Sequence, residues 1–148
     1  KLRESGLDSL IPTLKQPVFG ICLGMQLMCK SSEEGNTKGL GIFDVDVIKF
    51  TSKVKVPQMG WNQIYDLKSD LFKGIPENTY VYFVHSYYLQ AEEEEIVKAT
   101  TQYSTCIHAS VEKGNVFACQ FHPEKSSRWG LKILENFAAL ESGTGKEA

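Results

Sequence analysis

The sequence predicts a single α/β domain, and three observations support that prediction. A short apolar run at residues 17–21 (PVFGI) leads directly into a segment with helical spacing. The middle of the chain alternates apolar with polar residues or is rich in aromatic and β-branched residues, as strands are. Near the end, a hairpin signal is followed by an amphipathic helix. With 148 residues, of which 42% are hydrophobic, the chain is long enough to bury one core.

The N-terminal part of the chain predicts a helix, a buried strand and a second helix. Residues 1–15 carry leucines at mixed spacings, which predicts a short, interrupted helix. Residues 17–21 show no polar alternation, so we expect a central parallel strand covered on both faces. Residues 23–30 have helical spacing, and residues 35–41 (GNTKGLG) predict a loop. A strand, a sharp turn and a helix therefore meet at Cys22.

The remaining segments predict further strands and a final helix. Strand patterns are found at residues 45–47, 54–56 and 80–89. Two more apolar strands, 106–111 and 116–121, flank the turn residues Glu-Lys-Gly-Asn and so predict a hairpin. Ser126 and Ser127 then cap a helix with apolar residues at helical spacing.

Charge and hydropathy argue against nucleic acid and membranes as partners. The formal net charge is -2, whereas nucleic-acid and anionic-lipid binders usually carry clustered Lys and Arg. No apolar run approaches the roughly 20 residues that span a bilayer, and the N-terminus lacks the apolar core of a signal peptide. The four cysteines form no CxxC pair and no zinc-ligand spacing. We therefore expect reduced thiols, no metal or other cofactor, and a cytoplasmic location.

Gly20-Ile21-Cys22-Leu23-Gly24 has the spacing of a strained strand-to-helix turn that presents a nucleophile. Such a turn places the sulfur at a helix N-terminus, where free N–H groups favour the thiolate. The Leu23 N–H, which follows the nucleophile, is the expected oxyanion donor. A buried structural cysteine between two chance glycines is the alternative interpretation.

A second motif, His122-Pro123-Glu124, follows the apolar strand at residues 116–121. In an extended backbone, side chains two residues apart face the same side, so imidazole and carboxylate would address one point. A thiol needs a base, and the base needs a carboxylate that fixes its tautomer, so Cys22, His122 and Glu124 are the predicted catalytic triad. The alternatives are an ordinary loop histidine and a carboxylate that favours a helix dipole.

The other histidines and cysteines are weaker candidates. His108 lies in an alternating strand and is expected to be a half-exposed sheet residue. His85 ends a strand and either lines a pocket or is a hydrogen-bonded structural histidine. The remaining thiols, Cys29, Cys106 and Cys119, are expected to be small core residues.

The phrases FGICLGMQLM, around Cys22, and QFHPEKSS, around His122 and Glu124, resemble the class I (triad) glutamine amidotransferases. The resemblance implies a flavodoxin-like fold, with a mixed, mainly parallel sheet flanked by helices. It also implies hydrolysis of glutamine through a thioester on Cys22. The phrases PQMGWN, at residues 57–62, and VYFVHSYY, at residues 81–88, are similar to the members that serve histidine biosynthesis. The glutaminases of anthranilate and GMP synthesis are the alternative within the family.

The resemblance also implies binding roles. Gln26 and the Ser86-Tyr87 backbone match the family's binding site for substrate glutamine. Trp61 and Lys125 match positions that face a (β/α)8-barrel cyclase, the expected partner in a heterodimer, which receives the ammonia.

The sequence departs from the family at its start. Members begin with additional strands and a glycine-rich PGVG loop, so the domain at residues 1–141 is expected to be truncated at its N-terminus, with a flexible tail at 142–148. That loop supplies a second oxyanion donor, and the fragment is therefore expected to have little activity alone. Two alternatives stay open: a binding module that has lost turnover, and a related Cys-His γ-glutamyl hydrolase.

Overall fold

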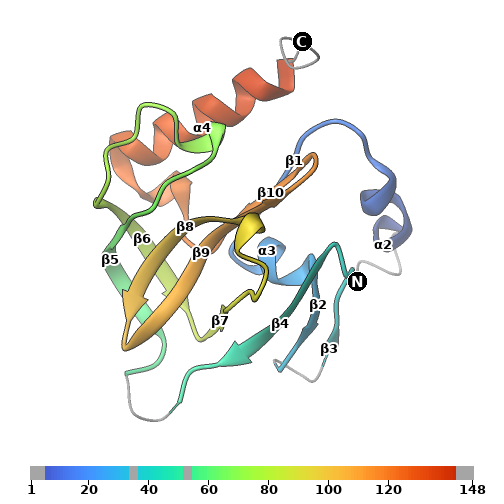
Figure 1. Ribbon diagram of the computed structural model, residues 1–148, viewed down its shortest axis with the longest axis horizontal. Coiled ribbons are helices and arrows are strands. Elements are labelled where there is room, and N and C mark those ends of the chain that lie inside the picture. Colours follow the sequence, from blue (N-terminus) through green and yellow to red (C-terminus); the bar gives the residue numbers. More distant parts are fainter. Residues whose placement is uncertain (1–5, 34–36, 52–54, 143–148) are drawn as a thin grey trace.

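A computed structural model describes residues 6–33, 37–51 and 55–142 of the chain. Its described elements are arranged in three sheets with one long helix, α4 (Ser127–Ser142), and two short ones (Figure 1). The short helices are α2 (Leu7–Leu10) and α3 (Leu23–Leu27), and the 3-10 turns are η1 (Ile11–Thr13), η3 (Asp70–Phe72), η4 (Glu94–Ile96) and η5 (Pro123–Lys125). In the part of the chain thus described, no helix is long and apolar enough to cross a bilayer.

The first sheet has the order β1-β10-β9-β8 and combines one N-terminal strand with the last three strands of the chain. Its strands are β1 (Val18–Ile21), β8 (Val97–Tyr103), β9 (Thr105–Lys113) and β10 (Val116–Cys119). Strand β1 pairs in parallel with β10, with Ile21 opposite Cys119. The other pairs are antiparallel, and the β9–β10 turn contains Gly114 at a φ of 60°. The predicted hairpin is therefore confirmed, although β10 ends two residues earlier than expected.

The second and third sheets come mainly from the middle of the chain. The second has the order β3-β2-β4-β7 and the third is the hairpin β5-β6. Their strands are β2 (Cys29–Ser32), β3 (Thr37–Lys38), β4 (Phe43–Lys49), β5 (Gln58–Ile64), β6 (Thr79–His85) and β7 (Tyr87–Leu89). Strand β5 lies antiparallel to β6, with Trp61 opposite Tyr82.

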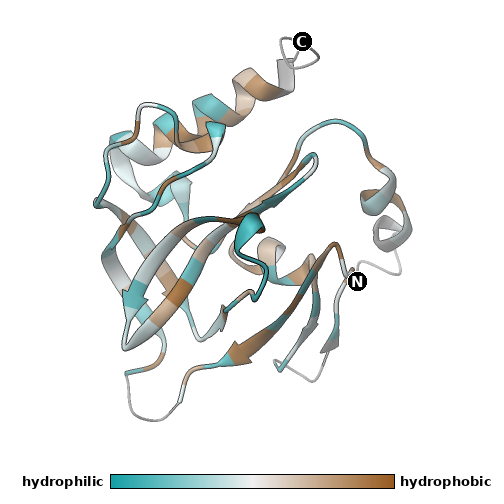
Figure 2. Ribbon diagram, in the orientation of Figure 1, coloured by the Kyte–Doolittle hydropathy of each residue, from teal (hydrophilic) through white to brown (hydrophobic). Residues whose placement is uncertain are grey.

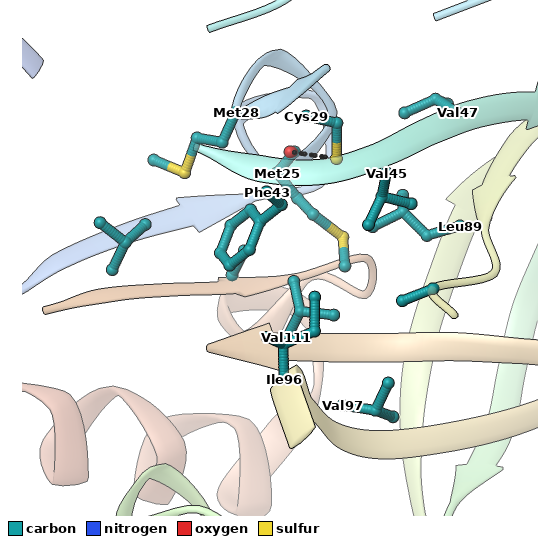
Figure 3. Close-up of a cluster of buried hydrophobic side chains, with 13 residues drawn as sticks. Met25, Met28, Cys29, Phe43, Val45, Val47, Leu89, Ile96, Val97 and Val111 are labelled. Carbon is teal, nitrogen blue, oxygen red and sulfur yellow. Dashed lines mark hydrogen bonds between the residues drawn. The ribbon is translucent and has the colours of Figure 1, made fainter. Parts of the chain in front are cut away.

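Two apolar clusters hold the layers together. One, which includes Met25, Phe43 and Val111, fills the space between β4 and the β9–β10 side of the first sheet (Figure 3). The other, which includes Phe83, Phe121 and Ile133, joins the first sheet and β6 to α4. Figure 2 shows that α4 is amphipathic: brown, apolar segments alternate along the helix with teal, hydrophilic ones. The first sheet is thus covered on both faces.

The α/β class with mixed sheets is confirmed, but parallel pairing does not dominate. Among the described strands, only β1–β10 and β2–β4 are parallel. The reason is the short connections in the second half of the chain, because a tight turn can join only antiparallel neighbours.

Several local predictions were wrong. The helix expected over residues 23–30 ends at Leu27, because Cys29 pairs with Phe43 and begins β2. Residues 37–38, expected in a loop, form β3, and residues 55–56 are not a strand. Val54 lies outside the described residues, as does the expected tail apart from Ser142, which ends α4.

Candidate active site

Cys22 lies at the sharp turn between β1 and α3, as the glycine spacing predicted. Its φ of 53° and ψ of -106° are unfavourable for a residue with a Cβ and cost on the order of 1–3 kcal/mol. Two backbone bonds hold the turn: the Cys22 N–H donates to the Cys119 carbonyl at 2.8 Å, and the Gln26 N–H donates to the Cys22 carbonyl at 3.2 Å. A Cβ on Gly20 would lie 3.0 Å from the Gly24 backbone, so this position requires glycine.

The parallel pairing of β1 with β10 brings the two predicted motifs to the same edge of the first sheet. Cys22 directly follows β1, and His122 comes three residues after β10 ends. Gln120, which directly follows β10, contacts the sulfur: its Nε2 donates to Cys22 Sγ at 3.5 Å. The sulfur also lies 3.6 Å from the Val84 carbonyl of β6.

His122 and Glu124 form a direct pair, with Nδ1 and Oε2 2.7 Å apart. The sequence predicted an extended backbone between the two residues, and this prediction was wrong. Pro123 instead starts the 3-10 turn η5, and the carboxylate reaches the ring across that turn. The His122 side chain is 20% exposed and that of Glu124 48% exposed. With Nδ1 engaged by a carboxylate, Nε2 is the ring nitrogen that can exchange a proton with a thiol.

The turn that carries His122 is fixed to β6 by a serine that the sequence analysis assigned only to helix capping. The Ser126 hydroxyl donates to the His122 carbonyl at 2.6 Å and accepts from the Tyr82 N–H at 2.9 Å. The His122 N–H donates to the Tyr82 carbonyl at 2.9 Å. The Ser126 backbone carbonyl accepts from the Gly130 N–H at 3.1 Å, whereas the hydroxyl bonds to His122 and Tyr82 and not to a helix N–H, as a serine cap would. A Cβ on Gly130 would lie 2.0 Å from the Pro123 carbonyl oxygen, so α4 and this turn approach closely.

Two of the predicted substrate-binding groups lie together. Gln26 is buried, and its Nε2 donates to the Tyr87 carbonyl at 3.3 Å and to Gln120 Oε1 at 3.0 Å. The Ser86 carbonyl accepts from the Phe50 N–H at 3.2 Å and so faces the second sheet. Leu23 is the first residue of α3, so its N–H has no acceptor within the helix. Its role as an oxyanion donor remains a prediction.

The two expected partner-facing residues are both exposed. Trp61 on β5 is 52% exposed and packs edge-on against Tyr82, with ring centroids 5.7 Å apart. Met59 and Tyr80, on the same hairpin, are also more than half exposed. Lys125 lies in η5, directly after the predicted Glu124.

His85 is a buried structural residue in contact with the site. Its Nδ1 lies 2.8 Å from the Tyr87 carbonyl, and its Nε2 lies 2.6 Å from the Gln58 side chain. Burial lowers the pKa of His85 to about 4. His108 is half-buried, accepts from the Ala91 N–H at Nδ1, and has a pKa lowered by burial.

The three thiols other than Cys22 divide into two buried and one exposed. Cys29 and Cys119 are buried, and burial raises the pKa of Cys29 to about 12 and that of Cys119 well above its ordinary value. Cys106 is exposed, so its assignment to the core was wrong: it lies on the outer face of β9, opposite exposed Gln102 of β8. Within the described ranges, no three His, Cys, Asp or Glu side chains are grouped so as to hold a metal ion.

Comparison with known proteins points to one family. Residues 5–140 match the model for glutamine amidotransferase class-I. Imidazole glycerol phosphate synthase subunit HisH of Bacteroides fragilis is 54% identical over 94% of this chain and 71% of its own length. The subunits HisH of Bacteroides thetaiotaomicron and Moorella thermoacetica are 51% and 45% identical, over 94% and 97% of this chain and 71% of each relative.

Solved structures agree on the fold. A glutamine amidotransferase from Thermotoga maritima, 20% identical, superposes with a TM-score of 0.62 over 95% of this chain and 55% of its own. Another glutamine amidotransferase, 18% identical, gives a TM-score of 0.64 over 93% of this chain and 71% of its own. The match to the family model and the identities with the curated relatives together show that the chain belongs to the class I glutamine amidotransferase family.

Proposed function

We propose that this chain is the glutaminase subunit of an imidazole glycerol phosphate synthase, and that Cys22, His122 and Glu124 are its catalytic triad. The observation that most supports the triad is the shared sheet edge, where the strained Cys22 turn follows β1 and the paired His122 and Glu124 follow β10. The relatives named HisH support the choice of enzyme.

The proposed reaction proceeds through a thioester. Cys22 Sγ gives up its proton to His122 Nε2 and attacks the side-chain carbonyl carbon of glutamine. The carbon–nitrogen bond then breaks as His122 returns the proton to the leaving nitrogen, which departs as ammonia. Water, deprotonated by the same ring nitrogen, attacks the thioester, releases glutamate and restores the thiol. Glu124 keeps the His122 proton on Nδ1 and stabilises the imidazolium.

The substrate is proposed to lie across the start of α3. The Leu23 N–H stabilises the oxyanion, while Gln26 and the Ser86-Tyr87 backbone hold the amino-acid end. The bond from Gln26 to the Tyr87 carbonyl supports this assignment, because it joins two of the proposed binding groups.

The proposed partner is a (β/α)8-barrel cyclase in a cytoplasmic heterodimer. Trp61 and Lys125 would face it, and the exposed Met59 and Tyr80 extend an apolar surface around Trp61. An exposed aromatic surface of this kind is common at interfaces between proteins. A closed interface would deliver ammonia before bulk water protonates it.

Glutamate release, measured with and without a cyclase subunit and its nucleotide, tests the proposal. We expect the cyclase to stimulate release, and Cys22→Ala to lower it by at least about 10³-fold. The matched control is Cys106→Ala, which removes another accessible thiol and should leave the rate unchanged. Equal losses in both variants would contradict the triad. Stimulation by an anthranilate or GMP synthetase subunit in place of the cyclase, or hydrolysis of γ-glutamyl peptides, would contradict the choice of enzyme.

A further inference from the structure

Gln120 is a fully buried polar residue whose side chain contacts two proposed site residues. It follows β10 directly and has a relative exposure of 0%. Its backbone N–H donates to the Ala109 carbonyl at 2.8 Å, which fixes its position against β9. The side chain reaches Cys22 Sγ with Nε2, at 3.5 Å, and Gln26 with Oε1, at 3.0 Å. Because a buried amide is unfavourable unless both ends are hydrogen-bonded, these contacts determine where the side chain lies.

The direction of the Gln120 amide follows from a backbone carbonyl. The Tyr87 carbonyl can only accept, so Gln26 must present its NH₂ group there. The same NH₂ group donates to Gln120, which therefore turns its oxygen toward Gln26. The NH₂ group of Gln120 is consequently the end that faces Cys22.

The contacts of the Cys22 sulfur with Val84 and with Gln120 favour opposite protonation states. The Val84 carbonyl can accept from S–H but offers nothing to a thiolate. The Gln120 N–H can donate to either form, and it donates more strongly to the charged one. Loss of the thiol proton therefore ends the contact with Val84 and strengthens the contact with Gln120.

We infer that Gln120 is a positioning residue that stabilises the Cys22 thiolate and holds Gln26 beside it. The inference rests on the proposed function for its meaning in catalysis, since Cys22 is there the nucleophile and Gln26 a substrate-binding residue. One carboxamide sets the spacing of these two groups, because it is hydrogen-bonded to both.

Alkylation of Cys22 by iodoacetamide, measured against pH by mass spectrometry, tests the inference without glutamine turnover. All proteins carry Cys106→Ser, which removes the other accessible thiol. Gln120→Met has nearly the same shape and lacks the N–H donor. We expect it to slow alkylation about tenfold at neutral pH, the lower end of the effect of a hydrogen bond to a charged group, and to displace the pH dependence upward. Gln120→Glu, which is ionised at alkaline pH beside the sulfur, should displace it further.

The matched control is Ser110→Ala. Ser110 is also buried, and its hydroxyl donates to the Ala118 carbonyl at 2.8 Å, a bond within the same sheet that does not involve the sulfur. It should leave alkylation unchanged, so that a general loss of stability is separated from a local effect. An unchanged rate and pH dependence in both folded Gln120 variants would overturn the inference.

A measurement on the unsubstituted chain covers the case in which the variants do not fold. The side-chain amide resonance of Gln120 should shift over the pH range in which Cys22 becomes reactive, and a resonance that stays constant over that range overturns the inference. The two assays test different claims: alkylation tests the role of Gln120, and glutamate release tests the proposed function. A chain with no glutaminase activity but with the expected alkylation profiles would contradict the proposed function and leave the role of Gln120 intact.

Discussion

Acidification should destabilise the folded protein through His85. Burial lowers the pKa of His85 from 6.5 to about 4, so the unfolded chain takes up the proton at a higher pH than the folded one. The free energy of unfolding therefore has its full value above about pH 6.5 and falls as the pH decreases. From the two pKa values, this group alone lowers the free energy of unfolding by about 2 kcal/mol between pH 8 and pH 5, and by about 3 kcal/mol below pH 4.

Urea denaturation at pH 8, 6.5 and 5, followed by tryptophan fluorescence, measures this effect. His85→Asn keeps a donor near the Tyr87 carbonyl and does not titrate. We expect the variant to be less stable at pH 8 and to lose about 2 kcal/mol less than the parent on going to pH 5. His108→Asn is the control. It removes a half-buried histidine, and it should change the pH dependence of the free energy of unfolding less than His85→Asn does. Identical pH dependence in the parent and His85→Asn would refute the reasoning.

Two further predictions concern the turns around the site, and a third concerns the burial of the thiols. Cys22→Gly should unfold with a free energy about 1 kcal/mol higher than Cys22→Ala in urea denaturation, because only glycine adopts the positive φ without strain, and equal values would contradict this. Gly130→Ala should lower the free energy of unfolding by about 2 kcal/mol or more, since the new Cβ would meet the Pro123 carbonyl at 2.0 Å, whereas Gly24→Ala, with open space, should not. Limited alkylation of the folded chain should modify Cys22 and Cys106 and spare the two buried thiols, and labelling of all four alike, read by peptide mapping, would show otherwise.

The turn at Cys22 and the pairing of His122 with Glu124 could be predicted because each motif is contiguous in sequence. Glycine on both sides of a cysteine predicts the turn, and a histidine two residues from a glutamate predicts their pair. The contribution of Gln120 could not be predicted in this way. It depends on the register of β1 and β10. The residues that directly follow these strands, Cys22 and Gln120, are 98 positions apart in the sequence. The available signal was a glutamine at the end of an otherwise buried apolar run.

The errors in secondary structure have a similar origin. Residues 28–30 fit a helix by their own spacing, and nothing in the sequence there stops one. Pairing of Cys29 with Phe43 buries both side chains completely, and that tertiary gain exceeds a local preference of a few tenths of a kcal/mol per residue. Cys106 was misplaced because a thiol is usually buried, whereas its strand has one face on the surface.

The hairpin strand β6 contacts both the exposed surface around Trp61 and the proposed catalytic residues. The Tyr82 carbonyl accepts from the His122 N–H, and the Val84 carbonyl lies 3.6 Å from the Cys22 sulfur, so the proposed base and the proposed nucleophile both contact one strand. The Tyr82 ring meanwhile packs on exposed Trp61. A partner protein that binds this hairpin and restrains it would reduce the thermal fluctuations of His122 and Cys22 together, without any rearrangement of the interior.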